Sequence, residues 1–206
     1  MKFMCGDRQA EAARRVRRGY PIHCYVGKNG SGKSLTCIFD TLPTLEEGRP
    51  VLSTVRLVDY ENPRPCDGWD YGFRMVGEEP QPCPLINPVT GEHVPDHNQS
   101  HPGYIRFTRW EQFATFQRGD VIMDEITGVA DSSDHAGMPH DVRNKLPQLR
   151  RADVAVRITG LSWARVNKRM RESCQGLTRC VGRLPQPASA EFAQDRIFRP
   201  KRMSVA

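Results

Sequence analysis

The chain has 206 residues, of which 38% are hydrophobic, and its 16 prolines and 17 glycines suit one loop-rich α/β domain. No run approaches the roughly 18 apolar residues of a membrane span, and the basic N-terminal segment lacks the apolar stretch of a secretory signal. We therefore expect a cytoplasmic protein that meets a membrane only through partners. Seven irregularly spaced cysteines favour reduced thiols over a disulfide framework.

The net charge of +6 is unevenly distributed. Residues 1–20 carry six Lys or Arg against two Asp or Glu, and residues 145–206 carry 14 against 4, whereas residues 21–144 carry 10 against 18. An acidic middle between basic ends suggests binding of a polyanion such as DNA, or of an acidic partner, near the termini. A solvated basic surface is the alternative interpretation.

Hydrophobic periodicity and Gly or Pro punctuation predict the elements in chain order. They are a helix at 8–18 ending at Gly19, a strand at 20–26, a helix at 33–42 stopped by Pro43, a strand at 51–57, a strand at 104–108, a helix at 110–116, a strand at 120–124, a mobile loop at 128–140, a helix at 142–151, a strand at 154–159, a basic helix at 164–172 and a strand at 177–181.

Residues 59–103 are rich in Pro, Gly and Asp without a sustained period, which indicates an insertion. We predict an α/β fold, with a mostly parallel sheet flanked by helices. Its parts are a basic helix at 1–19, the main domain at 20–183 with the Pro-rich insertion at 59–103, and a flexible basic tail at 184–206.

Residues 27–34, GKNGSGKS, match G-x-x-x-x-G-K-[ST] at every fixed position, after a predicted strand and before a predicted helix. Glycines let successive backbone N–H groups curl around a phosphate, which residues with a Cβ would obstruct. Lys33 is then expected to reach the β- and γ-phosphates, and the Ser34 hydroxyl to bind Mg²⁺. The α/β domain at 20–183 is therefore predicted to be a P-loop NTPase. Its predicted nucleotide-binding residues are Gly27, Lys28, Asn29, Gly30, Ser31, Gly32, Lys33 and Ser34.

Asp124 ends a continuous apolar strand, and Glu125 follows it at once. A P-loop needs a carboxylate at the tip of a neighbouring strand to hold Mg²⁺, and Asp124 fits that role. Glu125 is then placed to act as the general base, or to orient the attacking water. The pair favours ATP hydrolysis over transfer to a small acceptor; a purely structural acidic turn is the alternative.

Other P-loop classes fit less well. GTPases usually recognise guanine through an Asn-Lys-x-Asp motif. The chain has Asn-Lys at the start of residues 144–147 and 167–170, but both segments lack the Asp, which favours ATP over GTP. The basic segment 165–171 resembles the lid of a small-molecule or nucleotide kinase, which stays open as an alternative. A non-hydrolysing, ATP-dependent switch or assembly factor is a second alternative.

Several cations and a threonine extend the predicted site. Arg150 or Arg151, at a helix end before a strand, is a candidate for stabilising γ-phosphate charge across a subunit boundary, and a surface role is the alternative. Thr159, at the end of that strand, is a candidate γ-phosphate sensor. Arg165, Lys168 and Arg169 are expected on one helix face, where they would contact a phosphate backbone. Trp163 nearby is expected to pack in the core, with base stacking as the alternative.

The insertion contains Cys66, Cys83, His93, His97 and His101. His93 and His97 have a zinc-ligand spacing, but neither cysteine belongs to a Cys-x₂-Cys pair. A metal-free surface loop is therefore the favoured interpretation, and a zinc staple through Cys66, Cys83, His93 and His97 is the alternative.

The chain resembles the zonular occludens toxin-like ATPases of filamentous phages and related mobile elements, within the FtsK/HerA-type DNA-pumping P-loop class. The resemblance rests on residues 27–34, on VIMDE at 121–125 and on LPQLRRADVAVRITG at 146–160. It implies ATP-driven export, transfer or assembly of DNA by a homo-oligomeric ring. The chain departs from many members at Thr159-Gly160, where they carry Gln.

Overall fold

The computed structural model describes residues 7–59, 62, 64–70, 80–125, 139–181 and 201–204. The predicted loop at 128–140 lies almost wholly outside these residues, as do Cys5 and most of the predicted tail. Among the described helices, none has both the length and the hydropathy to span a bilayer.

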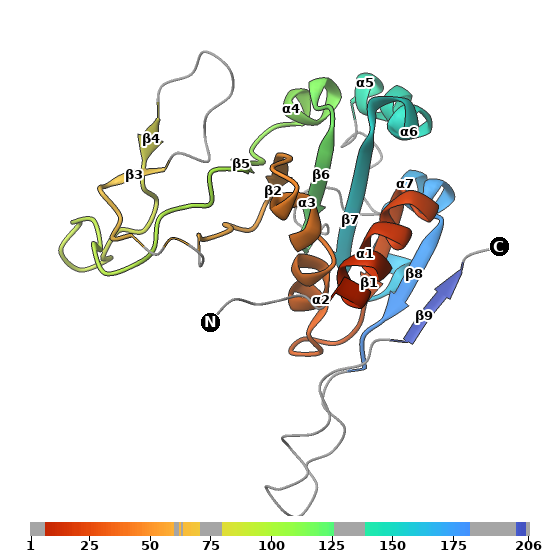
Figure 1. The fold of residues 1–206 in the computed structure, drawn as a ribbon, viewed down its shortest axis with the longest axis horizontal. Helices are drawn as coiled ribbons and strands as arrows, with labels where there is room; N and C mark the ends of the chain where they lie inside the picture. The colour runs from red at the N-terminus through yellow and green to blue at the C-terminus, as the bar shows by residue number, and fades with distance from the viewer. Residues whose placement is uncertain are drawn as a thin grey trace, which may run out of the picture.

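The centre of the molecule is a seven-stranded sheet in the order β5-β2-β6-β7-β1-β8-β9 (Figure 1). All neighbouring strands in it are parallel except β9, which runs antiparallel to β8. The predicted α/β P-loop fold with a mostly parallel sheet is confirmed. The strands are β1 Ile22–Val26, β2 Val51–Ser53, β5 Tyr104–Arg106, β6 Gly119–Met123, β7 Val154–Gly160, β8 Gly176–Arg179 and β9 Lys201–Ser204.

Helices cover both faces of this sheet. They are α1 Asp7–Gly19, α2 Lys33–Phe39, α3 Leu42–Glu46, α4 Trp110–Thr115, α5 His140–Lys145, the 3₁₀ turn η3 Leu146–Gln148, α6 Leu149–Ala152, the 3₁₀ turn η4 Trp163–Arg165 and α7 Lys168–Ser173. Because strand side chains alternate between faces, the sheet contributes to two separate cores. The larger packs Phe113, Val142, Leu149 and Met170 of α4 to α7 against strand residues such as Ile22, Val121 and Val156; the smaller packs Cys37 and Leu45 of α2 and α3 against Tyr25, Val51 and Ile122.

The core under α1 and α3 contains buried charge, which the strand patterns did not predict. Asp120 is fully buried and accepts hydrogen bonds from Arg17 Nε at 2.7 Å and from Thr44 Oγ1 at 3.0 Å. The fully buried Arg157 lies beside it, with Nη2 3.9 Å from Asp120 Oδ2. Asp120 thus ties α1 and α3 to β6 and β7.

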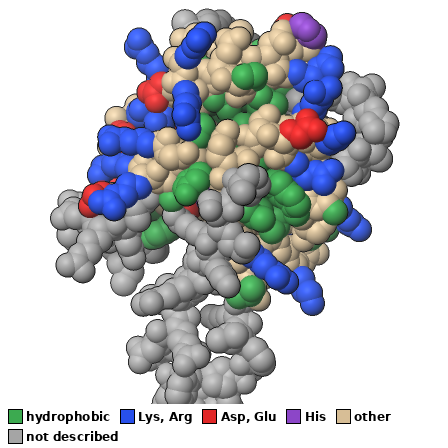
Figure 2. All heavy atoms as spheres, turned by 90° about the vertical axis from the view of Figure 1, so that its right-hand side faces the viewer, with side chains coloured by type: hydrophobic (Ala, Val, Ile, Leu, Met, Phe, Trp, Pro, Cys, Tyr) green, Lys and Arg blue, Asp and Glu red, His purple; other side chains and the backbone are tan. Residues whose placement is uncertain are grey.

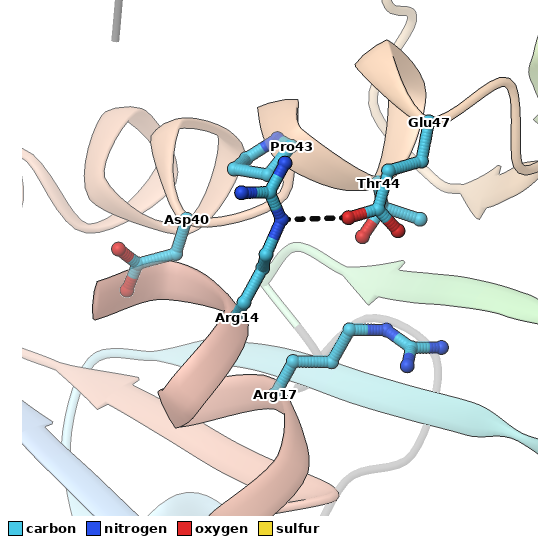
Figure 3. A pocket seen from close by; sticks show the side chains of 6 residues that line it. All are labelled: Arg14, Arg17, Asp40, Pro43, Thr44 and Glu47. Atoms are coloured by element: carbon cyan, nitrogen blue, oxygen red, sulfur yellow. Dashed lines mark hydrogen bonds and ion pairs between the residues drawn. The ribbon is translucent and has the colours of Figure 1, made fainter. Parts of the chain in front are cut away.

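A narrow pocket separates α1 from α3 (Figure 3). Arg14 and Arg17 of α1 face it from one side, and Thr44 and Glu47 from the other, with Arg14 Nε 2.7 Å from Glu47 Oε1. Two arginines of the basic N-terminal helix therefore neutralise acids of the domain itself.

Several predicted elements differ from the structure. The strand expected at 51–57 ends at Ser53, and the helix expected at 142–151 is divided into α5, η3 and α6. The helix expected at 33–42 ends at Phe39, and Pro43 does not stop it but lies in the first turn of a second helix, α3, where its missing N–H costs no hydrogen bond. The expected helix at 164–172 is broken, because Val166 is extended at ψ 137° and Asn167 caps α7 through a bond from the Arg169 N–H. Arg165 therefore does not share a helix face with Lys168 and Arg169. Residues 201–204 of the expected flexible tail form β9.

Candidate nucleotide-binding site

The loop of residues 27–34 joins β1 to α2 and packs against the ends of β7 and β8. Gly27 donates its backbone N–H to the Gly160 carbonyl at 3.2 Å, and a Cβ on Gly27 would lie 2.2 Å from the Cys180 carbonyl oxygen. Gly30 and Gly32 have φ of +70° and +81°, in the left-handed region that favours glycine. The backbone thus favours glycine at the two fixed positions of the motif, Gly27 and Gly32, and at Gly30 between them.

Polar atoms inside the loop are placed to receive an anion. Lys33 is buried in the first turn of α2, and its Nζ donates to the Lys28 carbonyl oxygen at 3.1 Å across the loop. The Ser31 hydroxyl is buried without a hydrogen-bond partner among the described residues. Such an unpaired buried hydroxyl costs free energy unless a ligand satisfies it. The loop therefore fits the phosphates of a nucleotide.

The hydroxyl of Ser34 meets Asp124 at the carboxyl edge of the sheet. Ser34 Oγ donates to Asp124 Oδ1 at 2.7 Å, and Thr159 Oγ1 donates to the same oxygen at 2.5 Å. The Asp124 backbone N–H donates to Thr54 Oγ1 at 2.8 Å. Hydroxyl and carboxylate oxygens are the ligands that Mg²⁺ prefers, so Ser34 and Asp124 fit a magnesium site.

The sequence analysis expected Asp124 at the tip of the strand next to β1, the strand that leads into the P-loop. In the structure, β6, which leads to Asp124, is not the neighbour of β1. β7 lies between β1 and β6 in the sheet. Thr159, near the end of β7, spans the gap by contacting Asp124, and Ser34 reaches the same carboxylate from the start of α2. The two halves of the site therefore meet over the end of an intervening strand.

Glu125 has a fixed backbone and an exposed side chain. Its φ of +49° lies in the left-handed region, which is uncommon for a residue other than glycine. Its backbone N–H donates to Thr159 Oγ1 at 2.8 Å. One threonine hydroxyl thus donates to the Asp124 carboxylate and accepts from the Glu125 backbone, and it fixes that backbone relative to the Asp124 carboxylate.

Two contributions to the site were not predicted from the sequence. Thr54 accepts the backbone N–H of Asp124. It was not predicted because the strand was expected to continue to residue 57, whereas β2 ends at Ser53. Cys180 closes the loop from the side of β8, with its N–H donating to the Val26 carbonyl at 2.7 Å. A polar residue at a strand end was the available signal for Thr54; nothing local indicates Cys180.

Arg150 and Arg151 lie on α6, which precedes β7, and both are exposed. The P-loop follows β1, which is parallel to β7, so the arginines and the phosphate loop are at opposite ends of the sheet (Figure 1). The seven residues of β7 span roughly 20 Å at about 3.3 Å per residue. Neither arginine lies at the phosphate loop of its own chain, and a role across a subunit boundary stays a prediction.

Several basic side chains of the C-terminal segment, residues 145–206, lie on the surface of the molecule. On the side where β8 and β9 lie, Lys and Arg side chains clearly outnumber Asp and Glu (Figure 2). Arg165, Lys168 and Arg169 are exposed. Trp163 is partly buried and packs against the larger core, as expected.

The structure gathers Cys66, Cys83, His93 and His97 of the insertion, with one potential ligand atom of each within 4.8 Å of the others. His101 is separate, because its Nδ1 accepts the N–H of Gly103 at 3.0 Å. The six described cysteines are free thiols, as expected. Burial raises the pKa of the Cys37 thiol well above its usual 9.0, so that it stays protonated in the core.

No family model and no curated protein matches the sequence. One solved structure of similar fold is the genome packaging NTPase B204 from Sulfolobus turreted icosahedral virus 2 in complex with ATP-gammaS, with 12% identity, 80% of this chain and 76% of that chain covered, and a TM-score of 0.47. Another is the N-terminal domain of zonular occludens toxin from Neisseria meningitidis, with 13% identity, 77% and 75% covered, and a TM-score of 0.42. At this level of similarity, the function has to be inferred from the site itself.

Proposed function

We propose that the chain binds ATP with Mg²⁺ at residues 27–34 and hydrolyses it. The main support is the convergence of Ser34, Asp124 and Thr159 through hydrogen bonds of 2.7 and 2.5 Å at the mouth of a glycine loop. Neither a glycine-rich turn nor an acidic turn taken alone explains why a serine at the start of α2 reaches an acid 90 residues away.

Each residue then has a defined task. The loop N–H groups and Lys33 bind the β- and γ-phosphates. Ser34 and Asp124 hold Mg²⁺, which neutralises charge on the phosphate oxygens. Thr159 and Thr54 keep Asp124 oriented through their hydrogen bonds to its carboxylate and its backbone N–H, and Thr159 is also the proposed γ-phosphate sensor.

Glu125 acts on the attacking water. The water oxygen forms a bond to the γ-phosphorus, the bond from that phosphorus to the β–γ bridging oxygen breaks, and ADP keeps the electron pair. The Glu125 carboxylate takes the proton that the water loses. The fixed Glu125 backbone supports this assignment, because a general base has to be held at a defined position.

We further propose that hydrolysis drives export, transfer or assembly of the DNA of a phage or mobile element, in the cytoplasm and in a homo-oligomeric ring. The exposed cations on the β8–β9 side and the resemblance of the sequence motifs support this step. Arg150 or Arg151 would then serve the site of a neighbouring subunit, since both lie far from the loop of their own chain.

Phosphate release and product analysis test the reaction. With Mg²⁺ and ATP, the chain should release inorganic phosphate and ADP, and GTP should be a poorer substrate. Transfer of phosphate to a small acceptor would instead select the kinase alternative. ATP binding with no turnover, with or without DNA, would select the switch.

DNA binding is tested separately by salt titration with single- and double-stranded DNA. Affinity should fall steeply with salt, and Arg169→Gln should weaken binding and reduce the salt slope by about one. Glu172→Gln, which removes an acid from the same helix, is the matched control and should not weaken binding. Affinity that is insensitive to salt would contradict the proposed basic face.

A further inference from the structure

The insertion is a small structural unit with almost no hydrophobic core. Between residues 58 and 103, the only hydrophobic side chains that are buried among those described are Cys66 and Cys83. Its larger apolar side chains face solvent: Trp69, Leu85, Ile86, Val89 and Val94. Units of this size that bury so little apolar surface usually need a disulfide or a metal ion to hold one structure.

The backbone nevertheless follows a defined path around the two cysteines. β3 (Trp69–Asp70) pairs antiparallel with β4 (Gln81–Pro82), and Cys83 follows β4 directly, its N–H donating to the Gly68 carbonyl at 2.7 Å. The Cys66 N–H donates to the His97 carbonyl at 3.0 Å. A second turn pairs Ile86 with His93. Residues far apart in the sequence are thereby brought to one point.

Two of the distances among these side chains match those between tetrahedral zinc ligands, and all four ligand atoms lie within 4.8 Å of one another. His93 Nε2 and His97 Nε2 are 3.3 Å apart, and His97 Nε2 is 3.5 Å from Cys83 Sγ. Zinc–nitrogen bonds of about 2.0–2.1 Å and zinc–sulfur bonds of about 2.3 Å give tetrahedral edges of about 3.3 Å between nitrogens and about 3.5 Å between nitrogen and sulfur. The observed separations agree with both edges.

The ring of His97 is held in the form that a metal requires. Its Nδ1 lies 2.9 Å from the Asn98 carbonyl oxygen, which can only accept, so Nδ1 carries the hydrogen and Nε2 presents its lone pair. Arg56 Nη1 is 3.3 Å from the same Nδ1, but two donors cannot bond each other. The Arg56 guanidinium donates instead through Nη2 to Asn98 O and through Nε to Ser100 Oγ, both at 3.0 Å.

We propose that the insertion binds one Zn²⁺ through Cys66, Cys83, His93 and His97. Two thiolates and two imidazoles match the preference of zinc, and four protein ligands make a closed, structural site. The lack of a Cys-x₂-Cys pair, which had favoured a metal-free loop, is no obstacle, because the β3–β4 pairing brings the cysteines together. The metal orders the insertion and takes no part in ATP chemistry.

Metal content of the full chain tests this proposal directly. Protein purified without chelator should hold about one zinc per chain by inductively coupled plasma mass spectrometry. Cys83→Ser and His93→Ala should lose this zinc, whereas His101→Ala, the matched histidine outside the cluster, should keep it. Zinc retained in Cys83→Ser, or no zinc in the wild-type chain even after zinc is supplied, would overturn the proposal.

A spectroscopic measurement covers the case in which these variants fail to fold. Co²⁺ added to metal-free wild-type chain should give one equivalent of binding, with the visible bands of a tetrahedral site and thiolate-to-cobalt charge transfer, and Zn²⁺ should displace it. An octahedral cobalt spectrum, or a Cys66–Cys83 disulfide found by peptide mass spectrometry of the freshly purified chain, would refute the site.

Discussion

Replacing Thr159 by valine tests how the two acids are positioned. The side chain is fully buried, and valine keeps its shape while removing the hydroxyl. Two hydrogen bonds are lost, one to the Asp124 carboxylate and one from the Glu125 N–H. A bond to a charged group contributes about 1.5–3 kcal/mol and a neutral one about 0.5–1.5 kcal/mol. We therefore expect stability to fall by roughly 2–4.5 kcal/mol.

The effect on turnover should exceed the effect on ATP binding. If the loss of positioning removes about 1.4–2.7 kcal/mol of transition-state stabilisation, kcat falls roughly 10- to 100-fold. The Kd for ATP should change less, because Lys33 and the loop are untouched. Thr159→Ser keeps the hydroxyl and loses only a methyl group, so it should retain most turnover. Steady-state phosphate release and calorimetric ATP titration of both variants provide the comparison. Equal turnover in Thr159→Val and wild type, or equal losses in both variants, would refute this reasoning.

Two other substitutions probe the loop and the buried charge. Gly27→Ala should abolish ATP binding in a calorimetric titration, since the added Cβ would lie 2.2 Å from the Cys180 carbonyl oxygen; unchanged affinity would show that the loop is not held as described. Asp120→Asn should lower the free energy of unfolding in urea by about 3–5 kcal/mol, because it removes the buried negative charge that faces both Arg17 and Arg157. A loss below about 1 kcal/mol would contradict this expectation, because so small an effect is typical of a solvent-exposed ion pair.

The parts of the site that depend on short sequence spacing were predictable. The glycine loop needs its glycines at fixed positions for steric reasons, and a continuous apolar run ending in two acids indicates a central strand with its tip at the site. Ser34, Asp124 and Thr159 were accordingly identified from the sequence and are joined by hydrogen bonds in the structure, and Lys33 reaches across its own loop to the Lys28 carbonyl. The parallel sheet followed from the same apolar runs.

The parts that depend on long-range pairing were not predictable. Asp120 and Arg157 sit within strand patterns that say nothing of a buried ion pair, because the partners come from different strands and from α1. Cys66 and Cys83 meet only because β3 pairs with β4. The break at Asn167 was missed because helix propensity favoured continuity, whereas its side chain caps a new helix.

Turnover of ATP by the wild-type chain and by Glu125→Gln, with binding measured on the same preparations, tests the proposed ATPase most directly. The wild type should release phosphate only with Mg²⁺, and Glu125→Gln should bind ATP with similar affinity but turn over at least about 100-fold more slowly. Lys33→Ala should fail to bind ATP and serves as the reference for a lost site. A wild-type chain that releases no phosphate with or without DNA, or a Glu125→Gln variant with wild-type turnover, would contradict the proposed hydrolysis.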